Sequence, residues 1–275
     1  MFFKNLSKPV VYFLLILWTV LVTYPLIYMF LTSVKSHGEI LQNPFGLPEN
    51  IKISNYLTAL TEYEMGEALI NSILVTAGSL IILILVAALA GYAVAKKAFP
   101  GNKIFFITMV AFIAIPIHAL VVPVYYFIEN LGLSNNLVAV MIIYAAFHLP
   151  ISILIMRSFF ENVPNAVEEA ARIDGCSEFR TFWYIALPMT KVGMATVAII
   201  NVITIWSEYL FASVLLTRPE SRTLPVAVGA VSSGNAGFDH GIFFASLGIA
   251  TIPMLIIYFV FSKQITKGVA SGAVK

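Results

Sequence analysis

Six long stretches of the chain are almost entirely apolar, and shorter polar segments separate them. A membrane-spanning helix needs about 20 predominantly apolar residues, and each stretch reaches that length. Membrane-spanning β-strands would instead show segments of about 10 residues with alternating polarity. Because lipid offers no hydrogen-bond partners, the backbone groups of such stretches must pair within a helix. The pattern predicts six transmembrane helices, at about residues 10–33, 70–95, 104–128, 137–156, 192–217 and 241–262.

The composition supports this interpretation. Of the 275 residues, 60% are hydrophobic and 11% are charged, whereas soluble domains have about 45–50% apolar and about 25% charged residues. An ordinary soluble enzyme and a disordered protein are therefore excluded. The net charge of +2 provides no basic field for nucleic acid, and the single cysteine, Cys176, excludes an internal disulfide. We expect an all-α polytopic membrane protein with one transmembrane domain over residues 1–275.

Lysine and arginine predict the orientation, because they are enriched in cytoplasmic loops. With the N-terminus in the cytoplasm, most of the 16 lysines and arginines fall on the inside, and six spans then place both termini there. The first span is too long for a signal peptide and lacks a small-residue cleavage site, so we expect it to be retained. The residues expected inside are Lys4, Lys8, Lys96, Lys97, Lys103, Arg157, Arg172, Arg180, Lys191, Lys263, Lys267 and Lys275.

The internal segment 157–191 is the longest cytoplasmic loop that this topology predicts. Asn165 can cap the N-terminus of a helix, with Glu168 as its capping-box partner three residues later. Glu168 and Arg172 are spaced for an i, i+4 ion pair. Gly175 is well placed to end the helix in a left-handed conformation. The loop is therefore expected to contain a short helix that ends in a tight turn.

The same loop predicts a second short helix that starts at Ser177, and Pro188 is expected to break the chain before the fifth span. Ala170 and Ala171 would leave one side of the first helix nearly bare. A helix lying on the membrane surface usually carries basic residues and large apolar ones. Acids and alanines favour docking into a protein groove, although the membrane-surface alternative stays open.

The order and spacing of residues in this loop are similar to a known signature. Glu169-Ala170-Ala171 is followed by Asp174-Gly175 and, after nine intervening residues, by Ile185-x-Leu187-Pro188. This resembles the EAA loop of permeases of binding-protein-dependent ABC importers. The resemblance implies an ATPase-docking surface formed by Glu169, Ala170, Ala171, Asp174 and Gly175. It also implies that Ile185, Leu187 and Pro188 anchor the return to the helix bundle.

Further short motifs along the whole chain, such as Asn71-Ser72 and Leu149-Pro150, resemble the MalG-like branch of maltose-type sugar importers. The resemblance implies the type I importer permease fold and transport of a carbohydrate across a bacterial or archaeal plasma membrane. It also implies a second homologous permease, two ATPase subunits that hold ATP and Mg, an extracellular solute-binding protein and the lipid bilayer as partners. No cofactor is expected in this chain.

The fifth predicted span contains Glu208, the only charge inside a span. Such a charge is costly unless it meets a polar cavity or partner. It could line or gate a pore, or it could make a structural hydrogen bond to a neighbouring helix. We take Glu208, Trp206, Tyr209 and the helix-kinking Pro116 as the candidate translocation path. Family members often have Asn where this chain has Ser207, which puts the local polar contact in doubt.

A membrane enzyme is disfavoured because the sequence has no phosphate-binding loop, no Gly-Lys pair and no recognisable catalytic motif. No metal site is expected, since the four histidines have no ligand-spaced acid or cysteine nearby. An ion-coupled secondary transporter or channel is the alternative, but such proteins usually carry several intramembrane ionisable residues. Small residues at Ala87, Gly91 and Ala95 predict close helix packing, either within this chain or with a partner.

Overall fold

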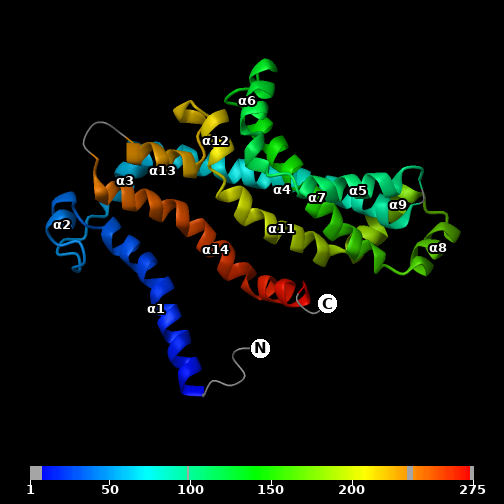
Figure 1. Ribbon diagram of the computed structural model, residues 1–275, viewed down its shortest axis with the longest axis horizontal. Coiled ribbons are helices and arrows are strands. Elements are labelled where there is room, and N and C mark those ends of the chain that lie inside the picture. Colours follow the sequence, from blue (N-terminus) through cyan, green and yellow to red (C-terminus); the bar gives the residue numbers. More distant parts are fainter. Residues whose placement is uncertain (1–7, 98, 234–237, 273–275) are drawn as a thin grey trace. The chain divides into compact units, whose positions relative to one another are not determined.

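The computed structural model describes residues 8–97, 99–233 and 238–272, and every regular element in these ranges is a helix (Figure 1). The chain forms two compact units. The first comprises Met1–Leu69 and Ala227–Pro253, and the second comprises Ile70–Val226 and Met254–Lys275. Lys4 and Lys275, which the orientation argument uses, lie outside the described residues.

The first unit contains α1 (Lys8–Ser33), α2 (His37–Gln42), α3 (Ser54–Thr61) and the beginnings of α4 (Met65–Lys96) and α14 (His240–Gly272). Lys35 is 1% exposed, and its ammonium donates to the backbone oxygens of Asn43 and Gly46. The amide of Asn55 donates to the backbone oxygens of Ser33 and Lys35, 2.9 Å away in each case. These bonds hold the Pro/Gly-rich loop against the end of α1.

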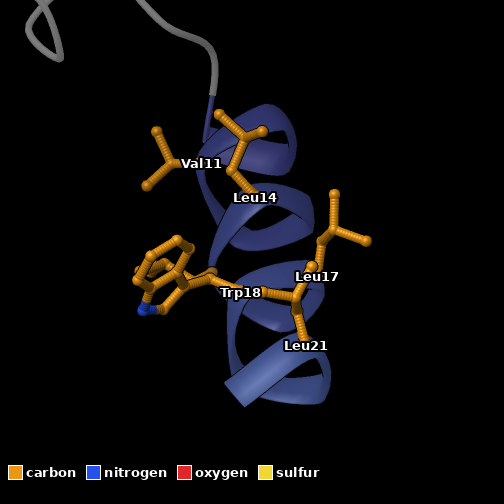
Figure 2. Close-up of a pocket in the computed structure, with 6 residues that line it drawn as sticks. Val11, Leu14, Leu17, Trp18 and Leu21 are labelled. Atoms are coloured by element: carbon orange, nitrogen blue, oxygen red, sulfur yellow. The ribbon is translucent and has the colours of Figure 1, made fainter.

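Helix α1 is apolar around its whole circumference, and none of its most apolar 18-residue window is buried. Figure 2 shows the labelled side chains Val11, Leu14, Leu17, Trp18 and Leu21, which line a shallow apolar pocket on this helix. Because an isolated helix with such a surface is incompatible with water, α1 requires lipid or another protein around it.

The second unit holds the rest of the helices and two buried apolar clusters. One cluster joins α4 and α7 to the segment before α11, with Met156, Phe160 and Phe182 at its centre. The other includes Tyr144 and Phe211. The elements are α5 (Asn102–Ile113), η2 (Ile117–Leu120), α6 (Val121–Asn130), α7 (Leu137–Glu161), α8 (Asn165–Ile173), α9 (Glu178–Thr181), η3 (Phe182–Ala186), α10 (Leu187–Met189), α11 (Lys191–Trp206), α12 (Leu210–Leu215), η4 (Pro219–Ser221) and the beginning of α13 (Leu224–Ser233), which belongs to the first unit from Ala227 on.

Four helices, α1, α4, α7 and α14, are long and apolar enough to cross a membrane, and they coincide with predicted spans. The third and fifth predicted spans are not single helices. The third divides into Asn102–Ile113 and Ile117–Asn130, which are bent by 91°. The fifth, predicted at 192–217, is interrupted after Trp206, and its first helix forms a bent pair with the preceding segment Glu178–Met189. Counting each bent pair as one span would bring the total to six, so the number of crossings stays a prediction.

The small-residue stripe on α4 packs against α7 of the same chain. A Cβ atom added to Gly91 would lie 2.8 Å from the Cβ of Met156 and 2.9 Å from the backbone nitrogen of Arg157. Ala87 is fully buried. Glycine at position 91 therefore allows the two helix backbones to approach closely. Of the two alternatives for close packing, a neighbour within this chain is the one that Gly91 meets.

Candidate functional site

The loop between α7 and α11 folds as a helix, a tight turn and a second helical segment, as the sequence predicts (Figure 1). The cap at the start of α8 differs from the prediction. Its N-cap residue is Pro164, which makes no side-chain capping bond. The side chain of Asn165 instead accepts a hydrogen bond of 2.7 Å from the Lys96 ammonium. Glu168 faces inward, so the predicted capping box does not form.

The end of α8 agrees with the prediction. Gly175 has a φ of +81°. The backbone N–H of Gly175 donates to the oxygen of Arg172, and that of Cys176 donates to the oxygen of Ala171. These two bonds are the Schellman arrangement that ends a helix at a left-handed residue. The glycine thereby lets the chain reverse within two residues.

Helix α8 has two distinct faces. Ala171 is 5% exposed and Glu168 3% exposed, so both side chains face the interior of the unit. Glu169 and Ala170 are exposed, and Ile173 is 87% exposed. The expectation that Ala170 and Ala171 share a bare outer side is therefore wrong for Ala171, because the helical turn places it next to the chain's own core.

The buried carboxylate of Glu168 connects α8 to the end of α4. The hydroxyl of Tyr92 donates to its Oε2 over 3.1 Å. The Lys96 ammonium lies 3.6 Å from Oε1, and the Arg172 guanidinium lies 3.8 Å from Oε2. The i, i+4 pair with Arg172 is the one that the sequence predicts, whereas Tyr92 and Lys96 are 76 and 72 residues away in sequence. Sequence spacing could not have found those two partners.

The segment after the turn leads back into the bundle. Ser177 accepts a hydrogen bond from the backbone of Arg180 and caps α9, as predicted. A π-helical turn follows at Phe182–Ala186. A break precedes the fifth predicted span, as the sequence predicts, but it does not lie at Pro188 itself. The helical direction changes by 69° at Thr190, two residues later. In a regular α-helix the ring of Pro188 would clash with the carbonyl four residues earlier. That carbonyl belongs to the π turn, in which the backbone is wider.

The anchor residues that the resemblance implies differ in burial. Ile185 and Leu187 are half-buried, and Pro188 is exposed. Leu187 packs against the cluster around Phe160 and Phe182.

An exposed ion-pair group links α9 to neighbouring elements. Glu178 pairs with Lys97 and with Arg172, whose guanidinium lies 2.9 Å from it. The hydrogen bond from Lys97, together with the positive charges of Lys97 and Arg172, lowers the pKa of Glu178 and outweighs the opposing effect of burial. This group lies on the face of the loop that carries α8 and α9.

Glu208 lies in a three-residue break between α11 and α12. Its Oε1 accepts a hydrogen bond of 2.9 Å from the backbone of Phe211, and its Oε2 accepts one of 3.1 Å from Ala212. The hydroxyl of Tyr144 on α7 donates to Oε2. The carboxylate therefore caps α12 and ties it to α7. Of the two alternatives for Glu208, a pore or gate residue and a structural hydrogen bond to a neighbouring helix, the hydrogen bond is present.

The other candidate path residues occupy different environments. Trp206 is 6% exposed at the end of α11, and Tyr209 is 50% exposed just after Glu208. Pro116 is exposed and lies in the break between α5 and η2.

Comparison with known proteins adds the family. The family described as "Binding-protein-dependent transport system inner membrane component" matches residues 84–271. The chain belongs to this family. The sequence resemblance to permease subunits of sugar ABC importers is thereby confirmed.

Relatives of this permease carry sugar-related names. The chain is 35% identical over 260 residues to the diacetylchitobiose uptake system permease protein NgcG of Streptomyces coelicolor, covering 94% of this chain and 86% of that one. It is 30% identical to the melibiose/raffinose/stachyose import permease protein MelC of Bacillus subtilis, with 91% of each covered.

A solved structure shares the fold of the permease. It is the crystal structure of a bacterial ABC transporter involved in the import of the acidic polysaccharide alginate. The TM-score is 0.81 at 25% identity, covering 94% of this chain and 99% of that one. The all-α membrane fold of an importer permease is therefore confirmed.

Proposed function

We propose that this permease is one membrane-spanning subunit of an ATP-driven importer that moves a carbohydrate across the plasma membrane. Its companions would be a second homologous permease, two ATPase subunits that bind ATP and Mg, and an extracellular solute-binding protein. The relatives named for diacetylchitobiose and for melibiose, raffinose and stachyose support an oligosaccharide cargo. Both termini would lie in the cytoplasm, as the distribution of lysine and arginine indicates.

The observation that carries the proposal is the outer face of α8 and its turn. Glu169 and Ala170 are exposed there, and Ile173 and Phe179 are large apolar side chains that are 87% and 68% exposed. Exposed apolar groups beside acids are typical of a protein-docking surface. We assign this surface, with Asp174 and Gly175, to contact with an ATPase subunit. Ile185, Leu187 and Pro188 would connect it to the bundle.

A crosslinking experiment tests the docking surface. Replacing Cys176 by serine removes the only cysteine, and Ala170→Cys then introduces one on the exposed face. A short bifunctional reagent is expected to link position 170 to an ATPase subunit in the assembled complex. Glu161→Cys in the same background is the matched control, because Glu161 is exposed at the end of α7. Crosslinks from position 170 to lipid alone would refute the docking assignment.

For the translocation path, we propose that Tyr209 and the backbone of the break at residues 207–209 contact the passing sugar. Tyr209 is half exposed, and aromatic rings offer flat apolar faces with a polar tip. Trp206 and Pro116 would shape the path, and Glu208 would hold the break in place rather than bind sugar. Tyr209→Ala should therefore impair uptake, while Tyr209→Phe should retain most of it.

Reconstituted uptake tests the function itself. Proteoliposomes containing the permease, its partner permease and the ATPase subunits would be assayed with radiolabelled diacetylchitobiose, melibiose and raffinose. Uptake is expected to require internal ATP and the external binding protein. Uptake driven by a proton or sodium gradient without ATP would instead establish an ion-coupled transporter.

A further inference from the structure

Glu168 is a buried charged residue inside the most exposed part of the cytoplasmic loop. It is 3% exposed, whereas its neighbour Glu169 lies on the outer face of α8. Its partners Tyr92 and Lys96 belong to the last two turns of α4. A carboxylate of the docking helix therefore reaches into the end of a membrane-spanning helix.

The geometry of this contact is poor for stability alone. Burying a carboxylate costs free energy that only close pairing and complete hydrogen bonding repay. Here the two cations lie 3.6 and 3.8 Å from the carboxylate, and its buried Oε1 accepts no hydrogen bond from the part of the chain that the structure describes. Apolar residues of similar volume would commonly stabilise such a site at least as well. Glu168 therefore contributes more to the orientation of α8 relative to α4 than to the free energy of folding.

Lys96 extends the connection to the start of α8. Its ammonium donates to the backbone oxygen of Val163 and to the side chain of Asn165. The ammonium is itself shielded, since the Lys96 side chain is 6% exposed. The Tyr92 ring packs against those of Phe160 and Phe182, with ring centroids 5.3 and 5.1 Å away. Polar contacts with the start of α8 therefore hold Lys96 in place, and aromatic packing holds Tyr92.

We propose that Glu168, Tyr92 and Lys96 form a rigid joint that transmits movement of α8 to α4. These are positioning residues, and the proposal rests on the proposed ATP-driven function. When a partner moves the outer face of α8, the joint makes α4 follow. Without it, α8 pivots about the peptide chain at Val163 and at the Gly175 turn, and the movement is lost.

Two variants test the joint in the full importer complex. Glu168→Gln keeps the size of the side chain but removes its charge, and Tyr92→Phe removes one hydroxyl while keeping the aromatic packing. Glu161→Gln is the matched control, because Glu161 is exposed and forms an ion pair along its own helix with Arg157. The measurements are sugar uptake, using whichever of diacetylchitobiose, melibiose and raffinose the unmodified complex takes up, and ATP hydrolysis by the same proteoliposomes.

In Glu168→Gln the sugar transported per ATP is expected to fall about fivefold or more, with hydrolysis retained. Tyr92→Phe should show a smaller loss of the same kind, and the control should match the unmodified complex. An unchanged ratio in both variants would overturn the proposal. A parallel loss of uptake, hydrolysis and assembly in Tyr92→Phe would also overturn it, because that is the signature of a merely structural role.

Hydrogen exchange measured on the permease within the assembled complex separates this proposal from the proposed function. The amides of residues 165–175 are expected to exchange faster in Glu168→Gln than in Glu161→Gln. If the unmodified complex shows no ATP-driven uptake, the proposed function fails, and with it the transmission role. If uptake is ATP-driven and α8 exchange and coupling are unaffected, only the joint is refuted. Faster exchange with an unchanged coupling ratio would equally refute transmission through it.

Discussion

The turn at Gly175 permits a sharp test, because the structure separates backbone strain from steric clash. Its φ is +81°, and a Cβ atom added there would have nothing within 4 Å. Within the permease a Cβ atom at this position therefore meets no neighbour, and its cost to the permease fold is conformational. The series Gly175→Asn, Gly175→Ala and Gly175→Val varies this cost, since asparagine tolerates the left-handed region best and β-branched residues least.

The magnitude follows from the cost of a left-handed L-residue, roughly 1–2 kcal/mol for alanine. A free-energy change of this size shifts a two-state ratio by about 5–30-fold. The properly capped end of α8 should lose population by that factor in Gly175→Ala, by less in Gly175→Asn and by more in Gly175→Val. Because this turn belongs to the proposed docking surface, its loss should lower sugar uptake per ATP.

The assay is reconstituted uptake together with ATP hydrolysis, and thermal unfolding in detergent checks that each variant is folded. The expected order of sugar moved per ATP is Gly, Asn, Ala and Val, from highest to lowest. Equal coupling in the Asn and Val variants would refute the reasoning. So would a Val variant that loses stability but keeps its coupling ratio.

Three further predictions concern stability and pH. Glu208→Ala removes the cap of α12 and leaves the hydroxyl of Tyr144 unpaired, so unfolding in detergent should become easier by roughly 2–3 kcal/mol; an unchanged melting temperature would contradict this. Gly91→Val should be destabilised by about 1–3 kcal/mol or more, because the added atoms meet the α7 backbone, whereas the control Gly38→Ala, which has open space around it, should not be. Glu178→Gln should lower the free energy of unfolding by less than about 1 kcal/mol, because the ion pairs of Glu178 are exposed. The lowered pKa of Glu178 means that its contribution is complete at neutral pH and is lost as the pH falls through that pKa; a loss on raising the pH would have the wrong sign.

Much of the architecture follows from local sequence properties. Long apolar runs predict α1, α4, α7 and α14, because a helix satisfies its own backbone within one run. The turn at Gly175 is equally local, since the left-handed conformation depends on one residue and its immediate neighbours. The spacing from Glu169 to Pro188 indicated the family for the same reason: it is a pattern within one short segment.

The tertiary structure decided what depends on partners distant in sequence. Glu168 has the sequence signature of a capping residue, but its carboxylate turns inward to Tyr92 and Lys96. Ala170 and Ala171 are adjacent residues of the same type, but Ala170 is exposed and Ala171 is buried. The hydrogen bond that Glu208 accepts from a neighbouring helix comes from Tyr144, which lies 64 residues away in sequence. Periodicity tells which residues share a helix face, but only packing tells which face meets the core, because burial is a property of the neighbours and not of the residue itself.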